Sequence, residues 1–204
     1  MLTGETQEKR DAALARLKAM LGKEASKHIT VSEAQDRFTR KYVYHVTSDV
    51  KDLGAISGNK VGTYFSHIIA SSKTVEYQIA TSFVTKAGTT VYTSSMLVGG
   101  AATVGAEEST TGNTQIFVHP ESAAHAEIAF SRPVMANRSD PPGVFLWFEN
   151  DVVDAHEFGH AYANAVEGRQ IKDSDATYGR AKEFENLQRD TYPNRTPRVR
   201  RAIE

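Results

Sequence analysis

The segment Asp154–His160 reads Asp-Ala-His-Glu-Phe-Gly-His and contains the pattern HExxH. Histidines four residues apart project from one face of an α-helix, so the imidazoles of His156 and His160 can bind one Zn²⁺. Glu157 lies between them and would stand near the open coordination position, where a carboxylate can deprotonate a metal-bound water. The pattern therefore requires a helix here and allows a particular chemistry on it.

The flanking residues favour a buried helix over Asn150–Glu167. Apolar residues recur there at spacings of three and four: Val152, Val153, Phe158, Tyr162, Ala163 and Val166. Asn150 or Asp151 can cap the start, and Gly168 sits where a helix usually ends. Small residues keep part of the surface low, as expected where another backbone or a metal comes close: Ala155, Gly159, Ala161 and Ala163. The helix is too apolar to be a solvated one.

A catalytic zinc site needs a third protein ligand and an open fourth position. The next helical stretch, Thr177–Asp190, carries two carboxylates, Glu183 and Glu185. They lie about 200° apart around a helix, so only one can face the metal. We choose Glu185, because it shares its face with Tyr178, Ala181 and Gln188, whereas Glu183 falls on a more polar side.

Other donors stay open as alternatives. The chain has no cysteine, so every zinc ligand must be a histidine or a carboxylate. Asp173 and Asp175, in the loop between the two helices, are the alternatives to Glu185, since aspartate also binds zinc. His119 and His125 flank a turn and are weaker candidates, because they lie far from the motif in the sequence.

The two helices carry a family resemblance. HEFGHA, followed by Ala181-Lys-Glu-Phe-Glu-Asn-Leu-Gln-Arg189, resembles the zincin metallopeptidases of the gluzincin class. More narrowly, it is similar to the NleD-type effector metallopeptidases and to the HExxH toxin domains of Rhs and other polymorphic bacterial toxins. Upstream, residues 62–72, 74–79 and 114–120 look like the helix and strands that enter that domain.

The resemblance implies a zinc-dependent endopeptidase of α+β, zincin-like fold with a small mixed sheet. By that resemblance His156, His160 and Glu185 are the zinc ligands and Glu157 is the general base. It further implies a bacterial effector or toxin that cleaves target-cell proteins, with a possible immunity or inhibitor protein as partner. A zinc hydrolase of a non-peptide bond, such as a deacylase, and a non-catalytic zinc-bound interaction module remain as alternatives.

The composition limits the possible size of the core and the possible partners, but it does not indicate a particular function. With 204 residues and 40% hydrophobic content, the chain can bury one good core. The net charge of −1 implies no general attraction to nucleic acid or membrane. The charged start, Glu5–Arg10, is no signal peptide. By the resemblance we expect a secreted effector that acts in the cytoplasm of a target cell after delivery by another apparatus, and otherwise a cytoplasmic protein.

The chain divides into an N-terminal helical extension, residues 1–41, and a zincin-like domain, residues 42–204. In the extension, Thr30-Val-Ser-Glu33 predicts a capping box that opens a second helix through Phe38. We expect a helix over Val61–Ser71 and a mobile loop over Gly99–Gly112. Short strands are predicted between residues 42 and 148: Tyr42–Val46, Thr74–Ile79, Thr90–Ser94, Gln115–Val118, Ala126–Phe130 and Val144–Phe148.

The sequence does not assign the oxyanion donor or the substrate-binding strand to a single residue or strand. A donor to the developing oxyanion could come from several side chains: Tyr162, Tyr178, Tyr192, Arg189 or Arg195. A substrate backbone could add to the strand before the metal helix or to one near Gln115–Val118.

Overall fold

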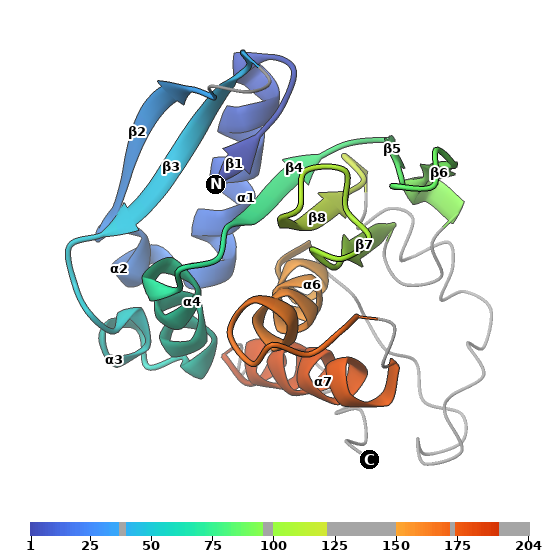
Figure 1. Cartoon of the computed structure of the whole chain (residues 1–204). Helices are drawn as coiled ribbons and strands as arrows, with labels where there is room; N and C mark the ends of the chain where they lie inside the picture. The colour runs from blue at the N-terminus through green and yellow to red at the C-terminus, as the bar shows by residue number, and fades with distance from the viewer. Residues whose placement is uncertain (37–39, 96–99, 122–149, 172–173, 192–204) are drawn as a thin grey trace.

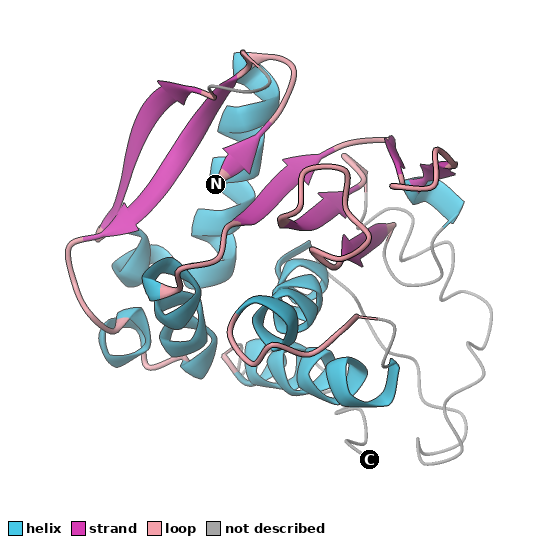
Figure 2. Ribbon diagram, viewed as in Figure 1, coloured by secondary structure: helices cyan, strands magenta, loops and turns pink. Residues whose placement is uncertain are grey.

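The computed structural model describes residues 1–36, 40–95, 100–121, 150–171 and 174–191 (Figure 1). The described chain is mixed α+β, as the sequence predicts (Figure 2). One sheet has six strands in the order β2-β3-β1-β4-β8-β7, with parallel pairing of β1 with β4 and of β4 with β8. Its strands are β1 (Leu2–Thr3), β2 (Ile29–Gln35), β3 (Tyr42–Ser48), β4 (Val75–Ile79), β7 (Ala101–Val104) and β8 (Thr114–Val118). A second, two-stranded sheet pairs β5 (Ser82–Val84) with β6 (Thr90–Tyr92), which a 3₁₀ turn (Thr93–Ser95) follows.

The helices bury one face of the large sheet. They are α1 (Gln7–Leu21), α2 (Lys23–Ser26), α3 (Leu53–Ser57), α4 (Lys60–Ala70), α6 (Asn150–Ala165) and α7 (Ser174–Asp190). Helix α1 contacts β4 and α6, and α6 also contacts β7, β8, α4 and α7. Alternation along β4 sends Tyr77 into the core with Leu17 and Phe158, and sends Glu76 to the opposite face. Helix α6 therefore lies at the centre of the packed layers.

The prediction of a second helix from Thr30 is wrong. Those residues form β2, which pairs antiparallel with β3 from Ile29↔Ser48 to Gln35↔Tyr42. The start of the segment, Ile-Thr-Val, is β-branched and favours a strand. Glu33, the last residue of the predicted capping box, instead forms an ion pair with Arg10 of α1, with 3.0 Å between Oε1 and Nη2. Pairing with β3 thus overrides a local helix signal.

The residues before position 42 are part of the sheet. Strand β1 lies between β3 and β4, and the β2–β3 hairpin spans the boundary at which the sequence analysis divides the chain. Thr6 caps α1 by accepting a hydrogen bond from the Lys9 backbone N–H. Helix α1 then packs on the metal-motif helix α6. The N-terminal stretch therefore supplies strands and a helix that help to position α6.

Several predicted elements are confirmed, namely the strands at β3, β4, β6 and β8 and the helix at α4. The predicted strands over residues 126–130 and 144–148 lie outside the described residues. The prediction of a loop over Gly99–Gly112 is wrong for Ala101–Val104, which form β7 and pair antiparallel with β8. Ala102 and Val104 pack against the Phe83–Phe117 cluster, which gives this short strand an apolar contact.

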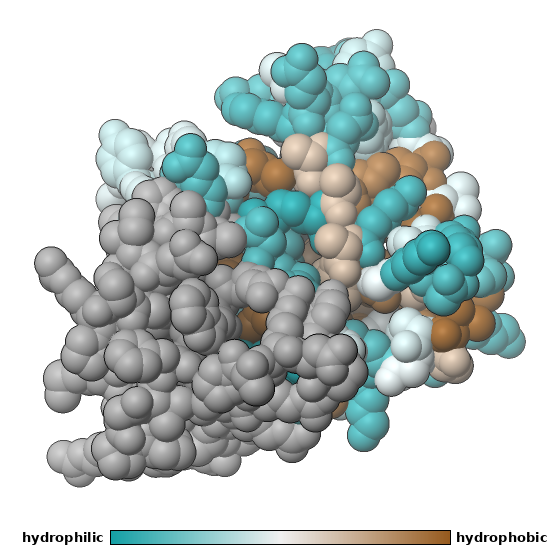
Figure 3. Space-filling view, turned by 180° about the vertical axis from the view of Figure 1, so that it is seen from behind, coloured by the Kyte–Doolittle hydropathy of each residue, from teal (hydrophilic) through white to brown (hydrophobic). Residues whose placement is uncertain are grey.

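On the face seen from behind, the described residues show hydrophilic side chains with apolar areas between them (Figure 3). Within the described ranges, no helix is long and apolar enough to cross a membrane.

Candidate metal centre

Helix α6 carries the HExxH motif through the protein interior. Its residues from Asp151 to Ala165 are buried, except for the half-buried His160. The chain leaves the helix at Gly168, whose φ of +73° lies in the left-handed region that glycine adopts without strain. The motif residues are therefore fixed on a rigid and well-packed element.

Helix α7 approaches α6 closely at Gly159. A Cβ atom added to this glycine would lie 2.6 Å from the Cα of Ala181 and 2.8 Å from the carbonyl oxygen of Arg180. Only glycine allows this separation of the two backbones. The close approach brings Tyr178 and Glu185 of α7 against the motif histidines.

The two histidines and Tyr178 form one aromatic group. The ring centroids of His156 and His160 lie 5.0 Å apart, with an interplanar angle of 74°. The ring of Tyr178 lies 5.7 Å from His156, edge-on, and 6.1 Å from His160, stacked. The phenol is therefore the candidate oxyanion donor that the structure places beside both imidazoles.

Glu185 is the acidic side chain of α7 that contacts the motif. Its Oε2 lies 2.9 Å from Nδ1 of His156, and the carboxylate also pairs with Arg189. Glu183 points elsewhere: it accepts a hydrogen bond of 2.8 Å from Tyr64 and pairs with Arg180. The structure therefore brings Glu185, and not Glu183, against the motif helix.

Burial sets the charge of the motif side chains. Burial lowers the pKa of His160 to about 3, so its imidazole is neutral at pH 7, which is the form that binds metals. Burial also raises the pKa of Glu157. Opposing this, the hydroxyl of Thr103 on β7 donates a hydrogen bond of 2.6 Å to Oε2 of Glu157 and holds the carboxylate in place.

The charged residues at the start of α6 are paired. Asp154, which is fully buried, is bound by two nitrogens of Arg16 at 2.7 and 3.0 Å. Asp151 accepts a hydrogen bond of 3.1 Å from Gln188. Arg16 also donates to the carbonyl oxygen of His119, at 3.4 Å. These contacts fix the N-terminal turns of α6 against α1 and α7.

The other candidate residues fall in several places. The hydroxyl of Tyr162 lies 3.4 Å from Nδ1 of His67, and its ring stands against Tyr64, away from the histidine pair. His119 is buried just beyond β8, where its Nδ1 accepts a hydrogen bond from the backbone N–H of Glu121. Asp175 belongs to the first turn of α7. His125, Asp173, Tyr192 and Arg195 lie outside the described residues.

Sequence reasoning missed two side chains of the site, Thr103 and Lys182. Thr103 fell in the segment Gly99–Gly112, which was interpreted as a loop because its residues are small and polar. Lys182 is only 2% exposed, and its Nζ lies 4.8 Å from the centroid of the Tyr178 ring. Nothing in a sequence distinguishes such a lysine from the exposed majority.

The donor set suits a metal ion. Among the described residues, no three His, Asp or Glu side chains are arranged to hold one. However, the Nδ1 atom of His160 is buried and has no hydrogen-bond partner, and a carboxylate already contacts His156. Two imidazoles and a carboxylate are the donors of a common catalytic zinc site. His156, His160 and Glu185 therefore fit the chemistry of zinc.

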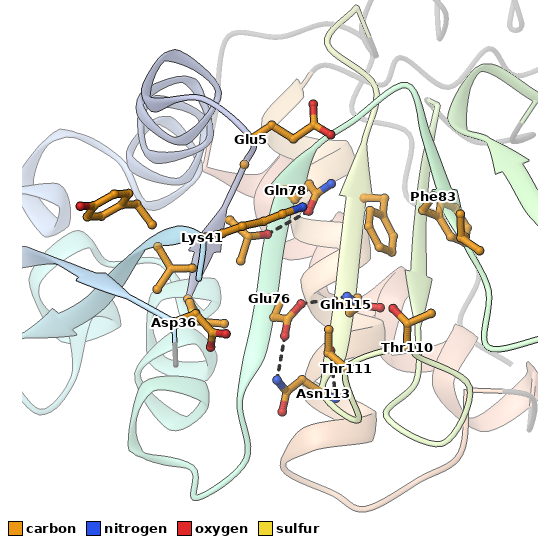
Figure 4. Close-up of a pocket in the computed structure, with 17 residues that line it drawn as sticks. Glu5, Asp36, Lys41, Glu76, Gln78, Phe83, Thr110, Thr111, Asn113 and Gln115 are labelled. Atoms are coloured by element: carbon orange, nitrogen blue, oxygen red, sulfur yellow. Dashed lines mark hydrogen bonds between the residues drawn. The ribbon is translucent and has the colours of Figure 1, made fainter. Parts of the chain in front are cut away.

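A separate cavity lies on the far face of the sheet. It has a volume of 530 Å³, and its floor carries Glu76, which accepts hydrogen bonds from Asn113 and Gln115 at 2.7 and 2.8 Å (Figure 4). None of the motif residues lines it. The cavity and the candidate metal centre are therefore distinct features on opposite faces of the sheet.

Comparisons with models of protein families, with curated proteins and with solved structures found no match to this chain.

Proposed function

We propose that this chain is a zinc-dependent endopeptidase whose metal is held by His156, His160 and Glu185. The observation that carries the proposal is the contact of Glu185 with His156, which joins a carboxylate from α7 to the HExxH pair on α6. A bound zinc ion supplies an acidified water and polarises the scissile carbonyl. The remaining chemistry falls to the side chains of this chain.

Glu157 is the general base of the proposed reaction. It takes the proton of the attacking water and passes it to the leaving amine. The raised pKa that burial gives this carboxyl favours the proton-carrying step, while the hydrogen bond from Thr103 fixes its orientation. Tyr178 is the proposed donor to the developing oxyanion, since its ring packs on both imidazoles.

The substrate backbone is proposed to add to β7. The sequence analysis suggested the strand near Gln115–Val118, but this strand is β8 and is flanked by β4 and β7, so its backbone groups are already paired. Among the described strands, β7 has a neighbour on one side only. An extended peptide can pair with such an edge by backbone hydrogen bonds. Thr103 belongs to β7 and contacts Glu157, so a docked peptide would run beside the base.

The biological role as a bacterial effector or toxin protease, with an immunity or inhibitor partner, is proposed by analogy with the sequence resemblance alone. Hydrolysis of a non-peptide bond by the same residues is the second candidate, because the metal and base chemistry do not depend on the leaving group. A cleavage assay on mixed proteins separates the two candidates.

The test is the substitution Glu157→Gln in the zinc-loaded protein. Glutamine is nearly isosteric and can still accept the Thr103 hydrogen bond, so fold and zinc content should be unchanged. Proton transfer is lost, and the rate should fall by roughly 10²–10⁴. The measurement is mass spectrometry of new peptide N-termini in a cell lysate, together with metal analysis.

Glu183→Gln is the matched control, since it alters an acidic residue of α7 that does not contact the motif. This control should keep its activity. Equal cleavage by the wild type and Glu157→Gln, or no cleavage by either, would contradict the peptidase proposal.

A further inference from the structure

Lys182 of α7 is a buried lysine that pairs with no carboxylate in the described part of the chain. The residue is 2% exposed, and its one contact of electrostatic character there is with the face of the Tyr178 ring, at 4.8 Å. A cation–π contact offsets only a small part of the cost of removing an ammonium from water. Among the described residues, the positive charge of Lys182 therefore has no compensating carboxylate.

The acidic residues beside Lys182 on α7 are engaged by other groups. Glu183, next along the chain, pairs with Arg180 and accepts a hydrogen bond from Tyr64. Glu185 pairs with Arg189 and contacts His156. Each of these carboxylates already has an arginine partner, so an anion that pairs with Lys182 would have to come from outside the described residues.

The position of the charge places it at the candidate metal centre. Lys182 follows Tyr178 by one helical turn, and the ring it contacts stacks on His160. Tyr178 thus contacts both motif imidazoles and also Lys182. An anion that meets Lys182 would therefore lie near Tyr178, the proposed oxyanion donor.

We propose that Lys182 binds a carboxylate group of the substrate next to the bond that is cleaved. The proposal rests on the peptidase function proposed above and adds a substrate class to it, namely peptides with an acidic side chain or a free C-terminal carboxylate at this subsite. A carboxylate is favoured over a phosphate because one ammonium balances the single negative charge of a carboxylate but not the charge of a phosphate dianion. Phosphate sites commonly use the forked donors of arginine, and Arg189 is already bound to Glu185.

The test compares the zinc-loaded wild type with Lys182→Met, which keeps the length of the side chain and removes the charge. Both are given a denatured-protein digest, and the cleavage sites are read by mass spectrometry. A defined pair of peptides with Glu or Gln at the preferred position, each with a free or amidated C-terminus, then separates the two sources of the carboxylate. We expect the wild type to prefer the carboxylate form by at least about tenfold in kcat/KM, and Lys182→Met to lose that preference.

The outcomes separate the two proposals. Cleavage that depends on Glu157 but shows no preference for a carboxylate would overturn the role of Lys182 and leave the peptidase proposal standing. Where the wild type cleaves nothing, binding of N-acetylglutamate against N-acetylglutamine is measured by calorimetry. Weaker discrimination in Lys182→Met than in the wild type supports the carboxylate site, and equal discrimination overturns it.

A stability measurement checks the charge itself. Removing an uncompensated buried ammonium should raise the thermal midpoint of Lys182→Met by about 2–4 °C or more. Lys27→Met is the matched control, because Lys27 is exposed and pairs with Glu24, and its midpoint should change little. A lowered midpoint for Lys182→Met would mean that the ammonium is already compensated, and would overturn the proposal.

Discussion

The buried polar groups at the start of α6 differ from those around its middle turns. At the start, Asp154 is held by Arg16 and Asp151 by Gln188, and each of these contacts has hydrogen-bond geometry. Around the middle, the Nδ1 atom of His160 has no partner, and the ammonium of Lys182 meets only an aromatic face in the described chain. Both regions pack against α7, so the neighbouring helix does not explain the difference.

In this protein, paired buried polar groups and unpaired ones have different roles. Buried polar groups of folded proteins are nearly always paired, because an unpaired one costs free energy. The paired set therefore fixes α6 in position, and the incomplete set is where we propose that a metal and a substrate complete the interactions. Locally unsatisfied groups of this kind are expected at functional sites.

The largest expected effect comes from breaking the paired region. Arg16→Met leaves the fully buried Asp154 carboxylate without its cation and should lower the free energy of unfolding by about 3–5 kcal/mol. Urea unfolding followed by circular dichroism measures this loss. The double variant Arg16→Met/Asp154→Leu should recover most of it, because no uncompensated charge remains.

Arg10→Met is the matched control for Arg16→Met. Arg10 is also buried, but its partner Glu33 is half exposed and can be solvated when the arginine is removed. The control should therefore cost less than Arg16→Met. An Arg16→Met loss no greater than that of the control would mean that the start of α6 does not depend on this ion pair.

A smaller effect is expected at the boundary between the two regions, where Glu185 contacts His156. Glu185→Ala and Glu185→Gln should each weaken zinc binding by about 100-fold or more, beyond the roughly 10- to 100-fold typical of a residue that only orients a ligand, and Glu183→Ala should leave it unchanged. Competition with a chromophoric chelator measures the affinity.

The Glu185→Gln variant distinguishes a zinc ligand from a residue that only orients His156. Glutamine can still accept the hydrogen bond from Nδ1 of His156 but is a poor zinc ligand. Full zinc affinity in Glu185→Gln would make Glu185 a residue that orients His156 rather than a ligand. Small and equal effects at Glu183 and Glu185 would transfer the third-ligand role to Asp173 or Asp175.

Local sequence patterns were sufficient to predict helix α6, but they could not predict the long-range contacts that hold it. Periodic apolar residues and the terminal Gly168 were sufficient for α6, because helix spacing is set within a few residues. The identity of the residue that would face the motif, Glu185, followed from helical phase. In contrast, the Arg16–Asp154 pair joins residues 138 positions apart, and no local sequence pattern predicts it.

The wrong predictions share a physical cause. Thr30–Glu33 has a capping-box sequence, yet those residues form β2 because β3 offers backbone partners along their length. Ala101–Val104 are too small and too close to glycines to suggest a strand, and they become β7 because they can pair with β8. In both cases a tertiary partner decided between local conformations of similar free energy.

The smallest expected effect tests the incomplete region directly, by His160→Leu. Without metal, the substitution removes a buried nitrogen that has no partner, so the free energy of unfolding should rise by about 1 kcal/mol. With zinc at about a hundredfold above its Kd, the wild type should gain about 2.7 kcal/mol that the variant cannot, so the order of stability reverses. Thermal unfolding with a chelator and then with added zinc measures both values.

His28→Leu, at a half-exposed histidine that bonds Asp49, is the control and should keep the full zinc response. An equal zinc response in His160→Leu and the wild type would place the metal elsewhere, and the contrast between the two regions would then say nothing about zinc.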